Sequence, residues 1–207
     1  MTDLLLTPVE ARVIASLVEK SIATPQYYPM TVNAILLASN QKSCRDPVLQ
    51  LREGEVGAAL LDLAEKGLAA RDDAGGRVPK WRQSFQHHLL LQPPAFAILV
   101  TLMLRGPQTQ SELRSNAVAL GGPADAEGIA RALADLADRG QPLVVLLPRA
   151  PGQKESRYGH TLSGPPDAPV AAAETPSRPS FVELEERLRA LEARVAALES
   201  AQGSGKP

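Results

Sequence analysis

The chain carries one pattern of elements twice, and this internal repeat limits the possible folds more than any other feature. The corresponding segments are LTPVEARVIASLVEK (6–20) with LQPPAFAILVTLMLR (91–105), PMTVNAILLAS (29–39) with PQTQSELRSNAVAL (107–120), and EVGAALLDLAEKGLAAR (55–71) with EGIARALADLADRGQPLVV (127–145). Within them, apolar residues recur every three or four positions, as on the buried face of a helix. Each half then continues into a strand, a turn and a return strand. The repeat therefore predicts three helices and a β-ribbon in each half.

Local capping motifs indicate where several of these helices begin and end. Thr7–Glu10 places Thr at the N-cap, Pro at the first helical position and Glu at the third, which is a capping box. Thr109–Glu112 repeats the box in the second half. Gly67 and Gly140 follow the third helix of each half, where a left-handed residue is favoured, and we predict that both adopt it.

Three helices followed by a hairpin is the arrangement of a winged helix. We therefore predict a mainly α protein with small β-ribbons, with winged-helix domains at residues 1–90 and 91–162. Two unrelated small α+β units are the alternative interpretation.

The C-terminal part of the sequence predicts a linker and a short coiled coil. Residues 163–179 are rich in Pro and Ala, which is typical of a linker, and 201–207 are predicted to be disordered. Between them, 180–200 has a heptad seam formed by Phe181, Leu184, Leu188, Leu191, Val195 and Leu198. In a parallel homodimer, arginines at the flanking positions would face glutamates of the other copy. A single helix packed on its own chain is the alternative.

Composition excludes several classes of protein. The 22 cations and 23 anions are evenly spread, with ten of each in residues 1–90 and seven against six in 91–162. Neither half is strongly basic, which argues against tight non-specific DNA binding, since that depends on neutralising phosphates. A single cysteine excludes an internal disulfide. The N-terminal residues lack the pattern of a signal peptide, and no segment has the length of a membrane span. We expect a cytoplasmic protein that does not enter a membrane.

Nothing in the sequence favours an enzyme. No phosphate-binding loop, dinucleotide fingerprint, metalloprotease motif or nucleophile elbow is present. Cys44 has no histidine in a recognisable catalytic or metal-binding motif with it, because His87 and His88 are adjacent residues and His160 is distant in sequence. We expect no catalytic residue, no metal and no cofactor.

Five stretches together resemble a known family. They are LTPVEARVIASLVEK, TPQYYPMTVN, SNQKSCRDPV, LRGPQTQSELRS and GQKESRYGHTLSG, and the resemblance runs from about residue 4 to 164. The sequence resembles the YceH-like family of uncharacterised bacterial proteins. The resemblance implies a tandem winged-helix fold, in agreement with the repeat, and it implies little about activity.

The predicted third helix of the first half is acidic, which leaves two functions open. It carries Glu53, Glu55, Asp62 and Glu65 against Lys66, and acidic helices repel phosphate. The third helix of the second half has Arg131 alone on its middle turn. One prediction is a dimeric regulator that binds DNA through wings and loops. The other is a protein-interaction scaffold that does not bind DNA.

The stretch SNQKSCRDP (39–47) is an insertion of about five residues between the second and third helices of the first half. Its polar side chains either contact a partner or have a structural role, with the amides satisfying helix-end groups and Asp46-Pro47 starting a turn. The candidate contacts to DNA or a protein partner, from this stretch and the two wings, are Asn40, Gln41, Lys42, Arg45, Arg52, Arg77, Lys80, Arg82, Arg149, Lys154 and Arg157.

Overall fold

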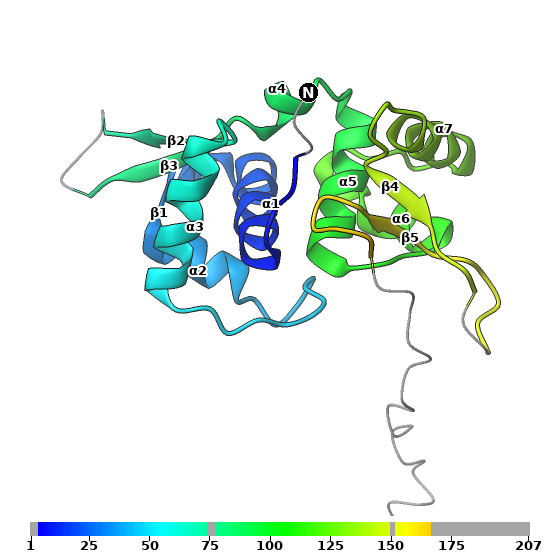
Figure 1. Ribbon diagram of the computed structural model, residues 1–207, viewed down its shortest axis with the longest axis horizontal. Helices are drawn as coiled ribbons and strands as arrows, with labels where there is room; N and C mark the ends of the chain where they lie inside the picture. The colour runs from blue at the N-terminus through cyan, green and yellow to red at the C-terminus, as the bar shows by residue number, and fades with distance from the viewer. Residues whose placement is uncertain (1–3, 74–77, 150–151, 167–207) are drawn as a thin grey trace, which may run out of the picture. The chain divides into compact units, whose positions relative to one another are not determined.

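The computed structural model describes residues 4–73, 78–149 and 152–166 (Figure 1). The chain divides into two compact units, Met1–Pro169 and Val170–Pro207, and every described residue belongs to the first. That unit is mainly α-helical with two small antiparallel sheets, which confirms the predicted fold class. Within the described ranges, no helix combines the length and apolar character needed to cross a membrane. The predicted heptad helix and tail lie outside the described residues.

The first repeat contains three helices and a three-stranded sheet. Its helices are α1 (Pro8–Ala23), α2 (Val32–Ser39) and α3 (Glu53–Glu65), and its strands are β1 (Met30–Thr31), β2 (Ala69–Asp72) and β3 (Lys80–Gln83). The strand order is β1-β3-β2, so the short β1 adds a third strand to the predicted ribbon. In this sheet Trp81 lies opposite both Met30 and Arg71. A 3-10 turn, Pro25–Tyr27, separates α1 from β1.

The second repeat has the same order of elements. Its helices are α5 (Pro93–Arg105), α6 (Gln110–Asn116) and α7 (Ala126–Ala137), and its strands are β4 (Val144–Leu146) and β5 (Tyr158–His160). A 3-10 turn, Val118–Leu120, follows α6. Gln108 forms a single antiparallel bridge with Tyr158, in the place that β1 occupies in the first repeat. Both repeats thus have the predicted order of three helices and a ribbon, and this order is compatible with tandem winged helices.

The predicted capping boxes are confirmed, and one predicted helix end is wrong. In both boxes the Thr hydroxyl accepts from the third helical N–H, while the Glu carboxylate accepts from the Thr N–H. Gly67 has φ +72° and ends α3 in the left-handed conformation, as predicted. Gly140 does not, because α7 already ends at Ala137 and Asp138 donates its N–H to the Ala134 carbonyl. A short helix between the repeats, α4 (Phe85–Leu89), was not predicted.

The core is centred on the first helix of each repeat. Every residue from Glu10 to Val18 of α1 and from Ala95 to Leu104 of α5 is buried. The two helices pack against each other in the middle of the unit (Figure 1), and the apolar side chains of both repeats form one cluster. The Leu6 N–H also donates to the Leu162 carbonyl at 2.7 Å, which joins the start of the first repeat to the end of the second.

Candidate functional site

Arg45, a predicted contact residue, points into the protein. It is 5% exposed, and its guanidinium forms a two-point ion pair with Glu19 of α1, with N–O distances of 3.1 and 2.6 Å. It also donates to the Ala38 carbonyl from Nε at 3.1 Å and from Nη2 at 2.9 Å. Burial alone would raise the pKa of Glu19, but the hydrogen bonds and charge of Arg45, with a contribution from Lys20, lower it overall. Arg45 therefore fixes the 40–51 loop to α1 and to the end of α2.

The two amides of the stretch also hold the loop in place. Asn40 donates to the Leu51 carbonyl and accepts from the Leu51 N–H, both at 2.9 Å, so it closes the loop with two bonds. The Gln41 Oε1 accepts from Arg45 at 3.1 Å and from Lys20 at 3.4 Å. The contacts of Asn40, Gln41 and Arg45 support the structural role that the sequence left open for this stretch.

A buried arginine of α1 anchors the other end of the loop. Arg12 is 3% exposed and donates to the Ser39 carbonyl at 3.3 Å and to the Pro47 carbonyl at 2.8 Å. Next to Pro47, the Asp46 N–H donates to the Leu104 carbonyl at 2.9 Å, at the end of α5. The inserted loop thus contacts both repeats.

Few charges of this loop remain available to a partner. Lys42 is exposed and has no ion pair with any residue that the structure describes. Arg52 is also exposed, but its Nε lies 3.2 Å from the Glu55 carboxylate. Cys44 is exposed with φ +59°, a conformation that non-glycine residues rarely adopt.

Two described arginines of the first wing pair with carboxylates. Arg82 pairs with Asp72 across the β2–β3 ladder. Arg71 pairs with Asp73 at 2.6 Å. Lys80 is half-buried at the start of β3, and Arg77 lies outside the described residues.

The second wing divides into one structural arginine and two exposed cations. Arg157 pairs with both oxygens of Glu112, at 2.7 and 2.9 Å, and donates to the Pro107 carbonyl at 2.8 Å. It therefore fixes the ribbon to the start of α6. Arg149 and Lys154 are exposed, and within the described ranges they have no carboxylate partner.

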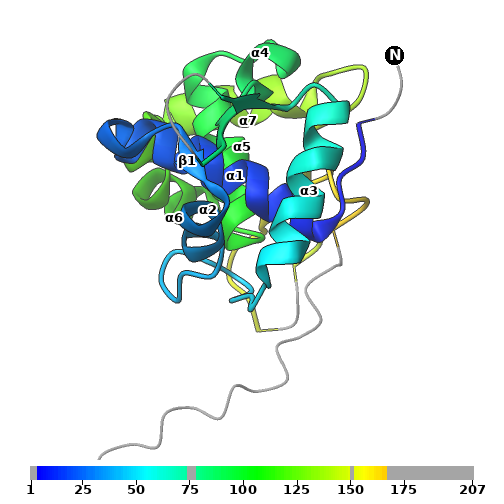
Figure 2. The same ribbon diagram turned by 90° about the vertical axis from the view of Figure 1, so that its left-hand side faces the viewer.

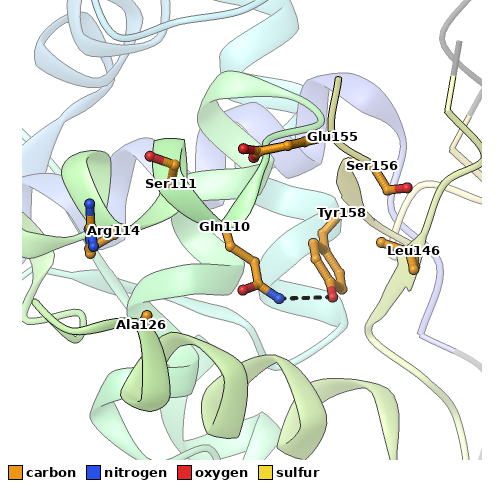
Figure 3. Close-up of a pocket in the computed structure, with 8 residues that line it drawn as sticks. All are labelled: Gln110, Ser111, Arg114, Ala126, Leu146, Glu155, Ser156 and Tyr158. Carbon is orange, nitrogen blue, oxygen red and sulfur yellow. Dashed lines mark hydrogen bonds between the residues drawn. The ribbon is translucent and has the colours of Figure 1, made fainter. Parts of the chain in front are cut away.

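A hollow of the described surface lies between α6 and the second wing (Figure 3). We name it the α6–wing groove; it has a volume of about 510 Å³ and is lined by Gln110, Ser111, Arg114, Ala126, Leu146, Glu155, Ser156 and Tyr158. Gln110 crosses the groove and donates to the Tyr158 hydroxyl at 3.2 Å (Figure 3). Leu146 is 58% exposed, so the groove combines an apolar side chain with an aromatic ring, amides, hydroxyls and one charge of each sign.

This groove was not predicted from the sequence, because the predicted contact residues lie in the loop before α3 and in the two wings. A signal was present, since the polar segment QSELRSN occupies the place of the apolar VNAILLAS in the repeat. In the structure Leu113 is fully buried while Ser111, Arg114 and Ser115 are exposed. The outer face of α6 is therefore rich in hydrogen-bonding groups.

A smaller hollow, of about 260 Å³, lies where the 40–51 loop meets the second repeat. Its lining includes Cys44, Asp46 and Arg105, together with the paired Arg45 and Arg157. The cations and carboxylates of this hollow largely offset each other.

Metal-binding clusters are absent from the part of the chain that the structure describes, where no three His, Cys, Asp or Glu side chains gather. His87 and His88 are exposed on α4. His160 lies on β5 with its Nδ1 buried and unpartnered, and burial lowers its pKa to about 4. None of these groups is arranged for acid–base or nucleophilic chemistry.

Fold and site together define an α+β protein of two similar repeats, with a polar groove in the second. The family model described as "Protein of unknown function, DUF480" matches residues 6–153. The UPF0502 protein GSU0233 of Geobacter sulfurreducens is 45% identical over 201 residues, which cover 95% of this chain and 91% of that protein. A UPF0502 protein of Geotalea daltonii is 47% identical over 174 residues, covering 84% and 79%. One of Acidovorax sp. is 45% identical over 201 residues, covering 93% and 89%.

The chain therefore belongs to the DUF480 family, whose curated relatives carry the name UPF0502. This is the same family as the YceH-like proteins, so the resemblance seen in the sequence is confirmed.

Proposed function

We propose that this chain is a non-enzymatic protein-interaction module that binds a partner protein in the α6–wing groove. The observation that supports this most directly is that four of the arginines predicted to contact DNA or a protein partner already pair with carboxylates, which leaves them less able to bind phosphate. These are Arg45, Arg52, Arg82 and Arg157.

Such pairing matters because affinity for DNA comes mainly from cations that replace the counterions of phosphates. An arginine that is buried against a glutamate cannot do so without leaving that carboxylate uncompensated. The acidic outer face of α3 also argues against DNA binding, because Glu53, Asp62 and Glu65 are exposed there and would repel phosphates. A conventional DNA-reading helix would carry cations and amides there.

The chemistry of the α6–wing groove suits a protein surface. Tyr and Arg are enriched among the residues that contribute most to protein–protein affinity, and Tyr158 and Arg114 both line the groove. The exposed Leu146 provides apolar area, while Ser111 and Ser156 provide hydroxyls. This mixture of an apolar centre with polar surroundings is typical of protein interfaces.

DNA binding through the second repeat is the second candidate function. It is favoured by Arg114, Arg149 and Lys154, which have no carboxylate partner among the described residues and belong to α6 and the second wing. Arg149 and Lys154 belong to the wing, through which the predicted DNA binding would occur. Glu155, which also lines the groove, opposes this function.

The test compares the full-length chain with two charge-reversal variants. Arg114→Glu changes the groove, whereas Arg131→Glu makes the same change on α7, outside the lining of the groove. Tagged proteins are used to capture partners from an extract of the source organism, with quantitative mass spectrometry as the readout. We expect at least one protein to be lost with Arg114→Glu and retained with Arg131→Glu. If no protein depends on Arg114, the proposal is overturned.

The DNA arm uses fluorescence anisotropy with a random-sequence duplex at several salt concentrations. Under the proposed function, we expect Arg114→Glu to leave any binding of the duplex by the wild-type chain in place. Binding that weakens steeply with salt and is lost in Arg114→Glu would instead support the second candidate.

A further inference from the structure

Helix α3 has an outer face that no other element covers among the residues that the structure describes. Its inner face is formed by Val56, Ala59, Leu60 and Leu63, which are all buried. On the opposite side, Gly54, Ala58 and Leu61 follow one another at spacings of four and three and are exposed, with Gly57 beside them. Leu61 is 60% exposed, although it lies in the middle of a well-packed helix. α3 stands at the surface of the first repeat (Figure 2).

Packing against the described part of the chain does not require a glycine at position 57. A Cβ at this position, or at Gly54, would meet no atom within 4 Å. Glycine in a helix interior costs about 1 kcal/mol relative to alanine, because the unfolded chain loses more freedom on folding. Small residues on an outer face do, however, allow a second helix to approach closely, since helix–helix distances depend on the side chains at the contact.

The charges around this face indicate what can cover it. Glu53, Asp62 and Glu65 are exposed, and no ion pair joins them to another described residue. A second copy of α3 would bring like charges together. The heptad segment 180–200 carries five glutamates and three arginines, so its net charge is also negative. The charges therefore complement a basic surface on a different protein.

The second repeat lacks this combination. At the position equivalent to Leu61, α7 has the small residue Ala134, and the residues beside it are already paired. Asp135 pairs with Arg139 at 3.9 Å and Glu127 with Arg131 at 4.0 Å. The exposed leucine with unpaired acids is thus particular to α3.

We propose that the outer face of α3, formed by Gly54, Gly57, Ala58 and Leu61, docks an amphipathic helix of a partner protein. The apolar stripe of that helix packs on Leu61 and the small residues, and its Lys or Arg side chains meet Asp62 and Glu65. This inference rests on the proposed function, in that the partner is a protein, but it uses a surface separate from the α6–wing groove.

The test uses a phage-displayed library of helical peptides with randomised outer positions, selected against the full-length chain. Gly57→Gln adds a side chain to the centre of the face and improves helix propensity, so the variant should fold. Ala130→Gln makes a similar change at the equivalent position of α7. We expect selected peptides to be basic and amphipathic, and to bind Gly57→Gln at least tenfold more weakly than the wild type. Their affinity for Ala130→Gln should change less than twofold.

A charge variant, Asp62→Lys with Glu65→Lys, should weaken the same peptides and reduce the salt dependence of their binding. The inference is overturned if the selection yields no peptide, or if the peptides bind Gly57→Gln and Ala130→Gln equally. Peptides that depend on Arg114 but not on Gly57 would overturn the inference and leave the proposed function standing. Peptides whose binding depends on neither Gly57 nor Arg114 would count against both the inference and the proposed function.

Discussion

Arg45 and Glu19 form an ion pair in which the arginine side chain is completely buried and the glutamate is 15% exposed. Removing one partner of such a pair leaves an uncompensated charge, which costs about 3–5 kcal/mol. We therefore expect Arg45→Met to lower the free energy of unfolding by about 3 kcal/mol, measured by urea denaturation. The double variant Arg45→Met with Glu19→Gln should recover part of the loss, because no unpaired charge remains. A single variant as stable as the wild type would contradict the structural role of Arg45.

His160 predicts a loss of stability in moderately acidic solution. Its pKa is about 4 in the folded chain against 6.5 for a free histidine, so the unfolded state binds more protons between these values. The contribution of neutral His160 to the free energy of unfolding should therefore be fully present above pH 6.5. It should be lost as the pH drops towards 4, which lowers the free energy of unfolding by about 3 kcal/mol at most.

The measurement for His160 is denaturant unfolding at several pH values, with His160→Gln as the comparison. The difference in stability between the two proteins should change between pH 6.5 and 4 and stay constant above pH 7. A constant difference over the whole range would show that His160 titrates normally.

Leu90 predicts a stabilising substitution. It follows α4 with φ +51° and is 81% exposed, so its side chain contributes little to packing. The left-handed backbone is strained at this residue because Leu has a Cβ. Leu90→Gly should raise the free energy of unfolding by about 0.5–1 kcal/mol, after the greater freedom of glycine in the unfolded chain is counted. Leu90→Ala is the matched control, since it removes the side chain but keeps the Cβ. Equal stabilities for the two variants would argue against the strain.

The heptad segment predicts a dimer. Because it lies outside the described residues, this prediction rests on the sequence. We expect Leu188→Asp with Leu191→Asp, in the seam, to halve the mass measured by light scattering. Arg189→Asp, between them but off the seam, should leave the mass unchanged. If the seam variant keeps the wild-type mass, the heptads do not hold two chains together.

Local signals made most of the fold predictable. The Thr7–Glu10 and Thr109–Glu112 boxes need only four residues to specify a helix start, and both are present as predicted. The repeat placed the three helices and the ribbon of each half. Gly140 shows the limit of such signals, because α7 ends at Ala137, three residues before the glycine that was expected to terminate it.

The candidate site was less predictable, because it depends on partners distant in sequence. A cation in a polar loop is typical of a contact residue, yet Arg45 turns inward to Glu19, 26 positions away. Arg157 similarly meets Glu112, 45 positions away. The polar outer face of α6 could have been predicted from the sequence, since the segment that forms α6 is polar where the equivalent segment of α2 is apolar. It becomes a groove only when the second wing lies beside it.

The packing of α1 on α5 gives the two repeats the relation of subunits in a homodimer. Each repeat contributes its first helix to a shared contact and covers the apolar side of the other. In a dimer of separate chains, such a contact would dissociate on dilution, since its stability depends on concentration. Here the covalent connection through α4 keeps both halves in a fixed ratio of one to one. The two halves are consequently free to diverge, so that one can present a polar groove and the other an acidic helix without the risk of wrong pairing between copies.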